Sequence, residues 1–227
     1  MFIYLDTETT GTGPDDRLCQ LAFKPGQGTV VNELFNPGRR IAIEAMAVHH
    51  ITNEMVRDKP PFKGSAAYMQ LIDLVAGPNN IVVAHNAKFD IDMLRNEGID
   101  PPKVICTLKL ARFLDKAGVI PQYNLQYLRY YLELKIEAKA HDALGDILVL
   151  EALFRRIYAR FQSDGVEDIE NEMIRISNAP ILIARMPFGK HKGMLFSEIP
   201  TDYLEWLYST ELDEDMAHTV RHHLGRA

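Results

Sequence analysis

Short apolar runs separated by polar, turn-forming residues dominate the first part of the chain and recur singly further on. The runs at 2–5, 18–24 and 29–35 follow one another closely, and the turn-prone segment PGQG separates the second from the third. Three such runs with short connections predict an antiparallel β-meander. Two later runs, 81–84 and 104–107, are short and bounded by polar residues, which predicts two more buried strands.

Apolar residues at helical spacing fill the intervals after the meander. Gly77 and Gly98 are typical helix stops, and Asn124 is a candidate N-cap. Strands in a meander, followed by strands that alternate with helices, predict an α/β fold with a mixed sheet and helices on its faces. The predicted helices cover 43–51, 63–77, 88–98, 108–118, 124–134 and 141–161.

The character of the sequence changes after the long helical pattern. Residues 164–180 are polar, acidic and helix-prone, and apolar positions resume after Pro180. We therefore expect one domain over 1–163, a linker over 164–180 and a small C-terminal module over 181–227.

The composition is that of an ordinary soluble globular protein, with 227 residues of which 47% are hydrophobic and 25% charged. No stretch approaches the ~18 apolar residues of a membrane span, and Asp6 comes too early for a signal peptide. We expect no membrane association and a cytoplasmic location. Cys19 and Cys106 fit no metal-ligand spacing and are expected to be reduced thiols. The net charge of -6 argues against coating of nucleic acid by bulk electrostatics, but not against a nucleic-acid enzyme.

Acidic residues adjoin three of the apolar elements. Asp6 and Glu8 follow the first strand two positions apart, which places them on one face, although such a pair alone is more often merely solvated. Asp90 lies in VVAHNAKFD and Asp146 in HDALGD, each beside an apolar element. Four carboxylates in one place would raise one another's pKa values, and divalent cations would remove that cost. Oxygen-only ligands favour Mg²⁺ or Mn²⁺ over Zn²⁺.

Such a site has a defined chemistry. Two metal ions roughly 4 Å apart can stabilise both the attacking and the leaving oxygen of a phosphoryl transfer. His141 lies in the same motif as Asp146 and is the candidate general base for the attacking water.

The motifs DTETTG, AHNAKFD and HDALGD together resemble those of the DEDDh 3′→5′ exonuclease superfamily, in the same order and with His141 five residues before Asp146. The stretches EAMAVHHITNEMVRDKP, ICTLKLARFL and FGKHKGMLFSEIPTDYLEWL extend the resemblance over nearly the whole chain. It implies a ribonuclease-H-like, DnaQ-like exonuclease fold. It also implies that Asp6, Glu8, Asp90 and Asp146 bind two Mg²⁺ ions and that His141 is the general base.

The resemblance further implies a nucleotide pocket. It assigns to this pocket Thr7 and Thr9 beside the first motif, His49 in AMAVHHIT, and Phe89 before the second-motif aspartate. A base stacked on Phe89 would be recognised without regard to sequence. The loop TGTGPDD lacks the bulky residues that could wedge between bases, so we expect single-stranded DNA 3′ ends to be favoured.

The segment FGKHKG places Lys190 and Lys192 between glycines, and no acidic residue occurs from Arg185 to Ser197. Glycines let backbone N–H groups approach a phosphate and lysines neutralise it, so we expect a phosphate-contacting loop. A solvated turn is the alternative. Trp206, in the helical pattern YLEWLY, is expected in the core of the C-terminal module, and a platform on which a base stacks is the alternative.

The sequence thus predicts a Mg²⁺-dependent 3′→5′ exodeoxyribonuclease that releases nucleoside 5′-monophosphates from DNA, with Mn²⁺ as an alternative ion. Two other functions stay open. An exoribonuclease that trims RNA 3′ ends would use the same site, because one contact to a 2′-OH can decide the sugar preference. A nucleic-acid-binding or partner-recruiting protein with a vestigial nuclease site is the second, and the intact acids and His141 count against it. No protein partner is readable from the sequence.

Overall fold

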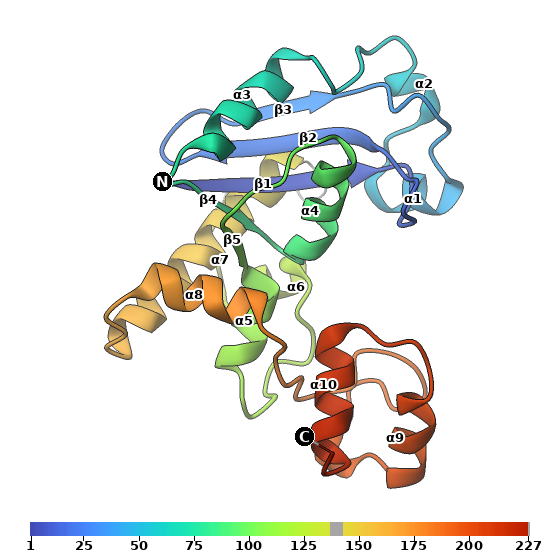
Figure 1. Ribbon diagram of the computed structural model, residues 1–227, viewed down its shortest axis with the longest axis vertical. Coiled ribbons are helices and arrows are strands. Elements are labelled where there is room, and N and C mark those ends of the chain that lie inside the picture. Colours follow the sequence, from blue (N-terminus) through green and yellow to red (C-terminus); the bar gives the residue numbers. More distant parts are fainter. Residues whose placement is uncertain (137–142, 227) are drawn as a thin grey trace.

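A five-stranded mixed sheet lies at the centre of the larger part of the molecule (Figure 1). The computed structural model describes residues 1–136 and 143–226, with the side chains of 143 and 144 excepted. The strand order is β3-β2-β1-β4-β5, with β1 antiparallel to β2 and parallel to β4. The predicted meander followed by parallel strands is therefore confirmed. The strands are β1 Phe2–Thr9, β2 Leu18–Pro25, β3 Val31–Leu34, β4 Ile81–Ala84 and β5 Val104–Cys106.

Helices cover both faces of this sheet. Helices α3 (Ala66–Ala76) and α4 (Ala87–Asn96) contribute to the core on one face. The other face carries α5 (Thr107–Leu114), α6 (Leu125–Tyr131), α7 (Ala143–Ser163) and α8 (Ile169–Asn178). The short helices α1 (Ile43–His49) and α2 (Asn53–Val56) lie between β3 and α3. Within the described residues, no helix combines the length and apolarity needed to cross a bilayer.

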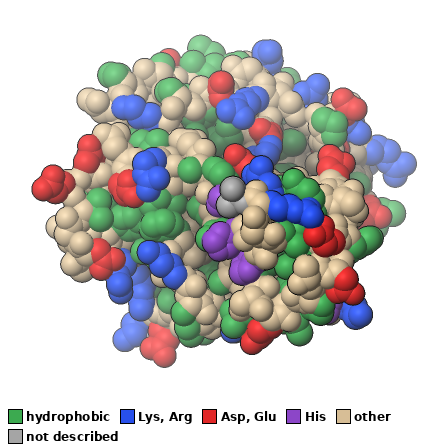
Figure 2. All heavy atoms as spheres, turned by 60° about the horizontal axis from the view of Figure 1, so that its bottom comes forward, with side chains coloured by type: hydrophobic (Ala, Val, Ile, Leu, Met, Phe, Trp, Pro, Cys, Tyr) green, Lys and Arg blue, Asp and Glu red, His purple; other side chains and the backbone are tan. Residues whose placement is uncertain are grey.

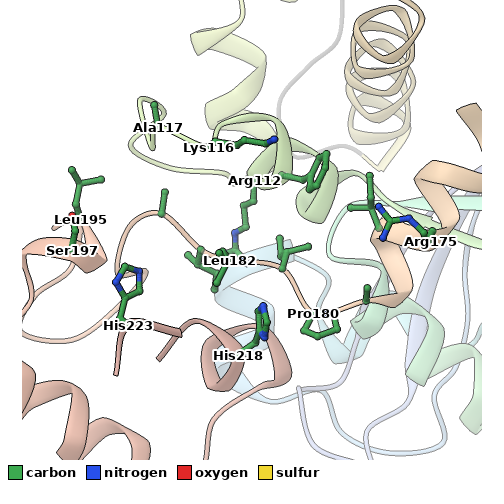
Figure 3. A pocket seen from close by; sticks show the side chains of 16 residues that line it. Arg112, Lys116, Ala117, Arg175, Pro180, Leu182, Leu195, Ser197, His218 and His223 are labelled. Carbon is green, nitrogen blue, oxygen red and sulfur yellow. The ribbon is translucent and has the colours of Figure 1, made fainter. Parts of the chain in front are cut away.

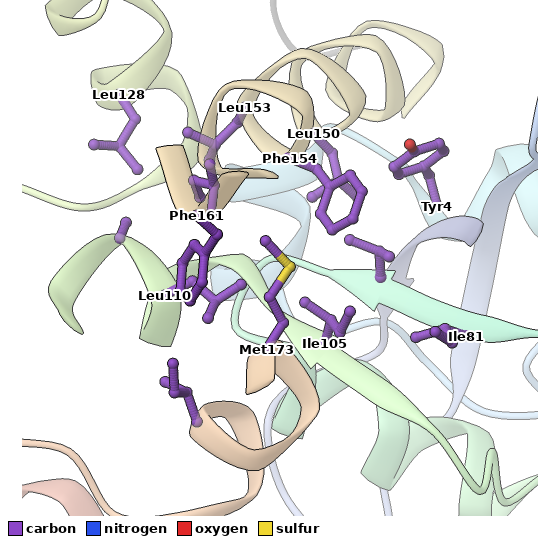
Figure 4. Close-up of a cluster of buried hydrophobic side chains, with 14 of the residues drawn as sticks. Tyr4, Ile81, Ile105, Leu110, Leu128, Leu150, Leu153, Phe154, Phe161 and Met173 are labelled. Atoms are coloured by element: carbon purple, nitrogen blue, oxygen red, sulfur yellow. The ribbon is translucent and has the colours of Figure 1, made fainter. Parts of the chain in front are cut away.

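Strand β1 divides its side chains between two hydrophobic layers. Ile3 and Leu5 pack in the layer with α3 and α4, whereas Tyr4 packs in the layer with α7, where its ring lies 5.7 Å from that of Phe154 (Figure 4). The alternation of a strand then places Asp6 and Glu8 on the α7 face. The apolar run ends at Leu5, but the strand continues to Thr9 because its backbone still pairs with β2. Both acids therefore belong to the strand itself.

Residues 164–180, expected as a linker, contain helix α8. Met173 and Ile176 of this helix are buried in the same cluster as the apolar face of α7. The backbone N–H of Cys106 in β5 donates to Ser177 Oγ at 2.8 Å, which fixes the helix to the sheet. Most of this range thus packs against the sheet, because two well-placed apolar residues bury a helix whose other residues are mainly polar.

A separate hydrophobic cluster begins at Ile183 and includes Phe196, Leu204, Leu207 and Val220. Helices α9 (Thr201–Tyr208) and α10 (Glu214–His223) and the short 3-10 helix Phe196–Glu198 form this C-terminal module. The module is held to the larger body by an ion pair between Lys109 and Asp215 at 3.1 Å.

Trp206 corrects the sequence-based expectation, because 56% of its surface is exposed. Leu204 and Leu207, three residues apart, lie on one face of α9 and fill the core. Trp206 lies two positions after Leu204, and a two-residue step turns a side chain to a different face of a helix.

Candidate active site

The carboxyl ends of β1 and β4 meet at one edge of the sheet because the two strands are parallel. Helix α4 begins directly after β4, and the left-handed backbone of Asn86, with φ 65°, makes the turn between them. Asp90 thereby comes to lie in the first turn of α4, where Thr7 of β1 donates to its Oδ1 from both the backbone N–H (3.0 Å) and Oγ1 (2.8 Å). The second acidic motif is thus fixed directly against the first.

Asp146 reaches the same place from the first turn of α7. The Nε2 amide of Gln126 in α6 donates a hydrogen bond to Asp146 Oδ1. No motif in the sequence points to Gln126, because its role depends on how α6 packs beside α7. A sequence signal exists only for the start of α6, where the predicted cap is confirmed by the bond from Tyr127 N to Asn124 Oδ1 at 2.8 Å.

His85 holds the segment that leads into α6. Its Nε2 lies 2.7 Å from the carbonyl oxygen of Tyr123, and its Nδ1 lies 2.9 Å from Thr107 Oγ1. Burial lowers the pKa of His85 to about 4, so the ring is neutral at physiological pH. His85 thus serves a structural purpose at the end of β4.

Negative charge accumulates at the sheet edge. Burial first, and then the neighbouring charges of Asp90, Glu8 and Asp146, raise the pKa of Asp6 well above its usual value. Burial and the charge of Asp146 raise the pKa of Glu8 to about 7. Burial also raises the pKa of Asp90, against the hydrogen bonds from Thr7 that lower it. The four acids named from the sequence therefore act on one another electrostatically.

This donor set fits hard divalent cations. Among the described residues, no ion pair involves Asp6, Glu8 or Asp90. Buried carboxylates without a cationic partner are costly, and oxygen ligands suit Mg²⁺ and Mn²⁺. As the described side chains are placed, no three His, Cys, Asp or Glu residues converge on one ion position.

Two of the four predicted pocket residues, Thr9 and His49, lie next to each other at the end of β1. His49 Nε2 lies 3.1 Å from the carbonyl oxygen of Thr9, and its Nδ1 accepts from Ile51 N at 3.0 Å. This pattern requires the proton on Nε2. Burial lowers the pKa of His49, which favours the neutral ring. Thr9 Oγ1 donates to Gly11 O at 2.6 Å and so ties the strand to the following loop.

Phe89 is partly exposed at a shallow hollow of about 410 Å³, whose wall includes Thr12, Gly13 and Pro14 of the TGTGPDD loop. Asp16 holds this loop in place, because it accepts from Thr10 Oγ1 at 2.6 Å and from Gly13 N at 2.8 Å. The ring of Phe89, the residue before Asp90, thus borders an open space where a planar group could stack.

The remaining candidates are separate from this cluster or undescribed. His141 lies outside the residues that the structure describes. Lys190 and Lys192 are exposed in a tight turn in which Lys192 N donates to Gly189 O at 3.2 Å. Arg185 donates to the carbonyls of Gly118 and Gly193 and braces this turn against the larger body.

Comparison with known proteins gives this geometry a context. Residues 3–154 match a family model described as Exonuclease, and residues 179–214 match one described as a quorum-sensing-regulated virulence factor. Exodeoxyribonuclease 10 of Escherichia coli (strain K12) is 29% identical to this chain in an alignment that covers 99% of each protein.

Solved structures are also similar. Exonuclease X in complex with 5′ overhanging duplex DNA is 30% identical, has a TM-score of 0.59, and aligns with 78% of this chain and 100% of its own. Exonuclease I of E. coli in complex with a dT13 oligonucleotide is 22% identical, has a TM-score of 0.59, and covers 72% of this chain and 42% of its own. At that lower identity the likeness is one of fold.

We expect Mg²⁺ or Mn²⁺ to raise the melting temperature of the protein more at pH 8 than at pH 5. The ion-free folded chain keeps a proton on Glu8 up to about pH 7, whereas an ordinary glutamate releases it near 4.5. Stability therefore falls as the pH rises between these values, and a cation can take the place of the proton above them. At one hundred times the dissociation constant, binding adds about 2.7 kcal/mol, which corresponds to roughly 5–10 °C. Differential scanning fluorimetry at both pH values measures this.

Two variants control this experiment. Asp146→Asn should reduce the ion-induced rise, and Asp164→Asn, which alters an exposed acid paired with Arg160 on α7, should leave it unchanged. An equal rise at pH 5 and pH 8 would contradict the assignment of these carboxylates as ligands.

We also expect Gln126→Ala to raise the Mn²⁺ concentration at the midpoint of this thermal shift about 10–100-fold, because Asp146 loses the amide that orients it. Gln70→Ala, at an exposed position of α3, is the matched control. If both variants showed the same midpoint as the unmodified protein, Gln126 would have no orienting role.

Proposed function

The chain belongs to the exonuclease family, and from that premise we propose that it is a 3′→5′ exodeoxyribonuclease that releases nucleoside 5′-monophosphates from DNA ends. It is a nuclease hydrolase, and the predicted ribonuclease-H-like, DnaQ-like fold is confirmed. The observation that carries the proposal is the electrostatic coupling of Asp6, Glu8 and Asp146 beside Asp90. The choice of DNA is supported by the name of exodeoxyribonuclease 10 and by the DNA in the Exonuclease X structure.

In this proposal Asp6, Glu8, Asp90 and Asp146 hold two Mg²⁺ ions, with Mn²⁺ as an alternative. When bound, such ions neutralise phosphate charge and lower the pKa of water. The residues of the chain do the rest. Thr7 donates two hydrogen bonds to Asp90 Oδ1. These bonds tie the Asp90 carboxylate to β1 and so set the orientation of its second oxygen. His141 accepts the proton of the attacking water.

The terminal nucleotide would lie over the end of β1. Thr7, Thr9 and His49 form its pocket, and the contact of His49 with the Thr9 carbonyl keeps this wall in one arrangement. The terminal base would stack on Phe89 in the hollow of about 410 Å³, an apolar contact available to every base. Because the loop at Thr12 and Pro14 offers no bulky side chain to separate paired bases, single-stranded ends are the preferred substrate.

Lys190 and Lys192 are the proposed second point of contact, with the phosphates of the strand. Among the described residues, no ion pair involves either lysine, so their charges are available to an anion. The bonds of Arg185 to Gly118 and Gly193 give the turn a fixed position for such a contact.

Cleavage of matched 5′-labelled DNA and RNA oligonucleotides tests the proposal. A ladder shortening from the 3′ end of single-stranded DNA is expected with Mg²⁺ and not with EDTA. His141→Ala should slow it about 10²–10⁴-fold, the range for loss of a general base, and Asp146→Ala should abolish it. His222→Ala, at an exposed histidine of α10, is the control.

Each of the other outcomes would indicate a different function or substrate. A ladder on RNA alone would indicate RNA trimming. Slower cleavage of single strands than of duplexes with 5′ overhangs would show that the preferred end structure is the duplex. Bound metal with no ladder on any substrate would leave a binding protein.

The double variant Lys190→Ala/Lys192→Ala should weaken binding to single-stranded DNA and lower the slope of log K against log salt by about 1.4, since each phosphate contact contributes about 0.7. Cleavage of very short substrates should be unaffected. The pair Lys59→Ala/Lys63→Ala, also exposed, is the matched control. An unchanged salt slope would show that FGKHKG is a solvated turn, the alternative to a phosphate-contacting loop.

A further inference from the structure

A cleft of about 560 Å³ separates the C-terminal module from the larger body (Figure 3). One wall comes from α5 and the turn after it, another from α10 and the segment around Leu195, and the connecting segment at Pro180 and Leu182 lies between them. Its volume is in the range of pockets that hold small organic ligands, about 300–1,000 Å³. None of the residues assigned to the acidic cluster or the nucleotide pocket lines it.

The lining of this cleft is cationic. Arg112, Lys116 and Arg175 contribute to it, as do two histidines, and no Asp or Glu does. Arg175 is paired with Glu172 at 2.6 Å, but among the described residues no ion pair involves Arg112 or Lys116. Figure 2 shows the lower face of the molecule, on which histidines gather and Lys and Arg side chains lie around them. An anion in the cleft would therefore meet Arg112 and Lys116, and no carboxylate belongs to the lining itself.

Arg112 gives the strongest indication of a ligand. Its Nε is buried and has no hydrogen-bond partner, while its guanidinium lies 5.7 Å from the ring centroid of Tyr123. Figure 3 shows the side chain extending from α5 toward Leu182 across the cleft. A donor of a charged group that is left unmet in the protein interior costs free energy, and the planar guanidinium is suited to a phosphate.

The other walls add two features. Phe113, Ile181 and Leu182 give apolar surface, and Leu182 is 44% exposed. Ser197, His218 and His223 add hydrogen-bonding groups from the module side (Figure 3). A cationic group, apolar surface and several further hydrogen-bonding groups in one cleft suit a nucleotide better than an acyl anion, whose apolar body has no polar edge.

We propose that this cleft binds a nucleoside monophosphate unit, either free or within a strand, at a site separate from the acidic cluster. The phosphate lies at Arg112, the base lies against Leu182, and the module side supplies the polar contacts, with Lys116 adding positive charge to the same wall. The choice of a nucleotide over other amphipathic anions rests on the proposed function, which produces this compound.

Titration calorimetry on the full chain in EDTA tests the proposal, with dAMP, a dT10 oligonucleotide and decanoate as probes. Saturable binding of dAMP or of dT10 is expected, and Arg112→Met should weaken it at least tenfold. Arg160→Met, at an exposed arginine paired with Asp164 outside the cleft, should leave it unchanged.

Leu182→Trp provides a second variant that fills the cleft and keeps its charge, in case Arg112→Met fails to fold. It should weaken binding as Arg112→Met does. Binding of dAMP with higher affinity than dT10 would mark the free compound as the ligand, and the reverse would mark the strand. Binding of decanoate alone, or equal affinity in Arg112→Met, Leu182→Trp and the unmodified chain, would overturn the proposal. The cleavage ladder is measured separately, so an active chain with an empty cleft refutes only this site.

Discussion

The arrangement of this protein depends on the cost of holding like charges together in a place poor in water. Asp6 and Glu8 extend a strand whose preceding residues are core, and Asp90 and Asp146 approach from two helices. Burial first, and then the charges of neighbouring carboxylates, raise the pKa values of Asp6, Glu8 and Asp90. The rest of the fold has to supply the stability that this site lacks. Unfavourable local interactions of this kind are typical of functional sites.

That stability comes from two hydrophobic layers that share one strand. Ile3 and Leu5 belong to one layer and Tyr4 to the other, so β1 is fixed on both faces immediately before its acids begin. Polar contacts then fix two of the four acids. Thr7 holds Asp90 and Gln126 holds Asp146, so the geometry of the site is set by hydrogen bonds between elements that the packing has already brought together.

The sequence predicted the parts of this molecule whose cause is local. Strand and helix periodicity, the Asn124 cap and the three acidic motifs all depend on neighbouring residues, and the mixed sheet followed from their order. The predictions that were wrong, and the residue that was missed, concern features that depend on tertiary packing. Two buried residues make α8 part of the body, a two-residue step turns Trp206 outward, and only the docking of α6 against α7 gives Gln126 a partner.

The contact between the two ends of the larger body has a consequence for synthesis on the ribosome. The ring of Phe2 lies 4.6 Å from that of Phe154, so the first strand completes its packing with one of the last elements of the body to be made. Contacts so distant along the chain form late, because a long loop must close first. The nascent chain carries Asp6, Glu8 and Asp90 long before Asp146 and α7 leave the exit tunnel. The acidic cluster is therefore complete only when translation of its domain is nearly finished.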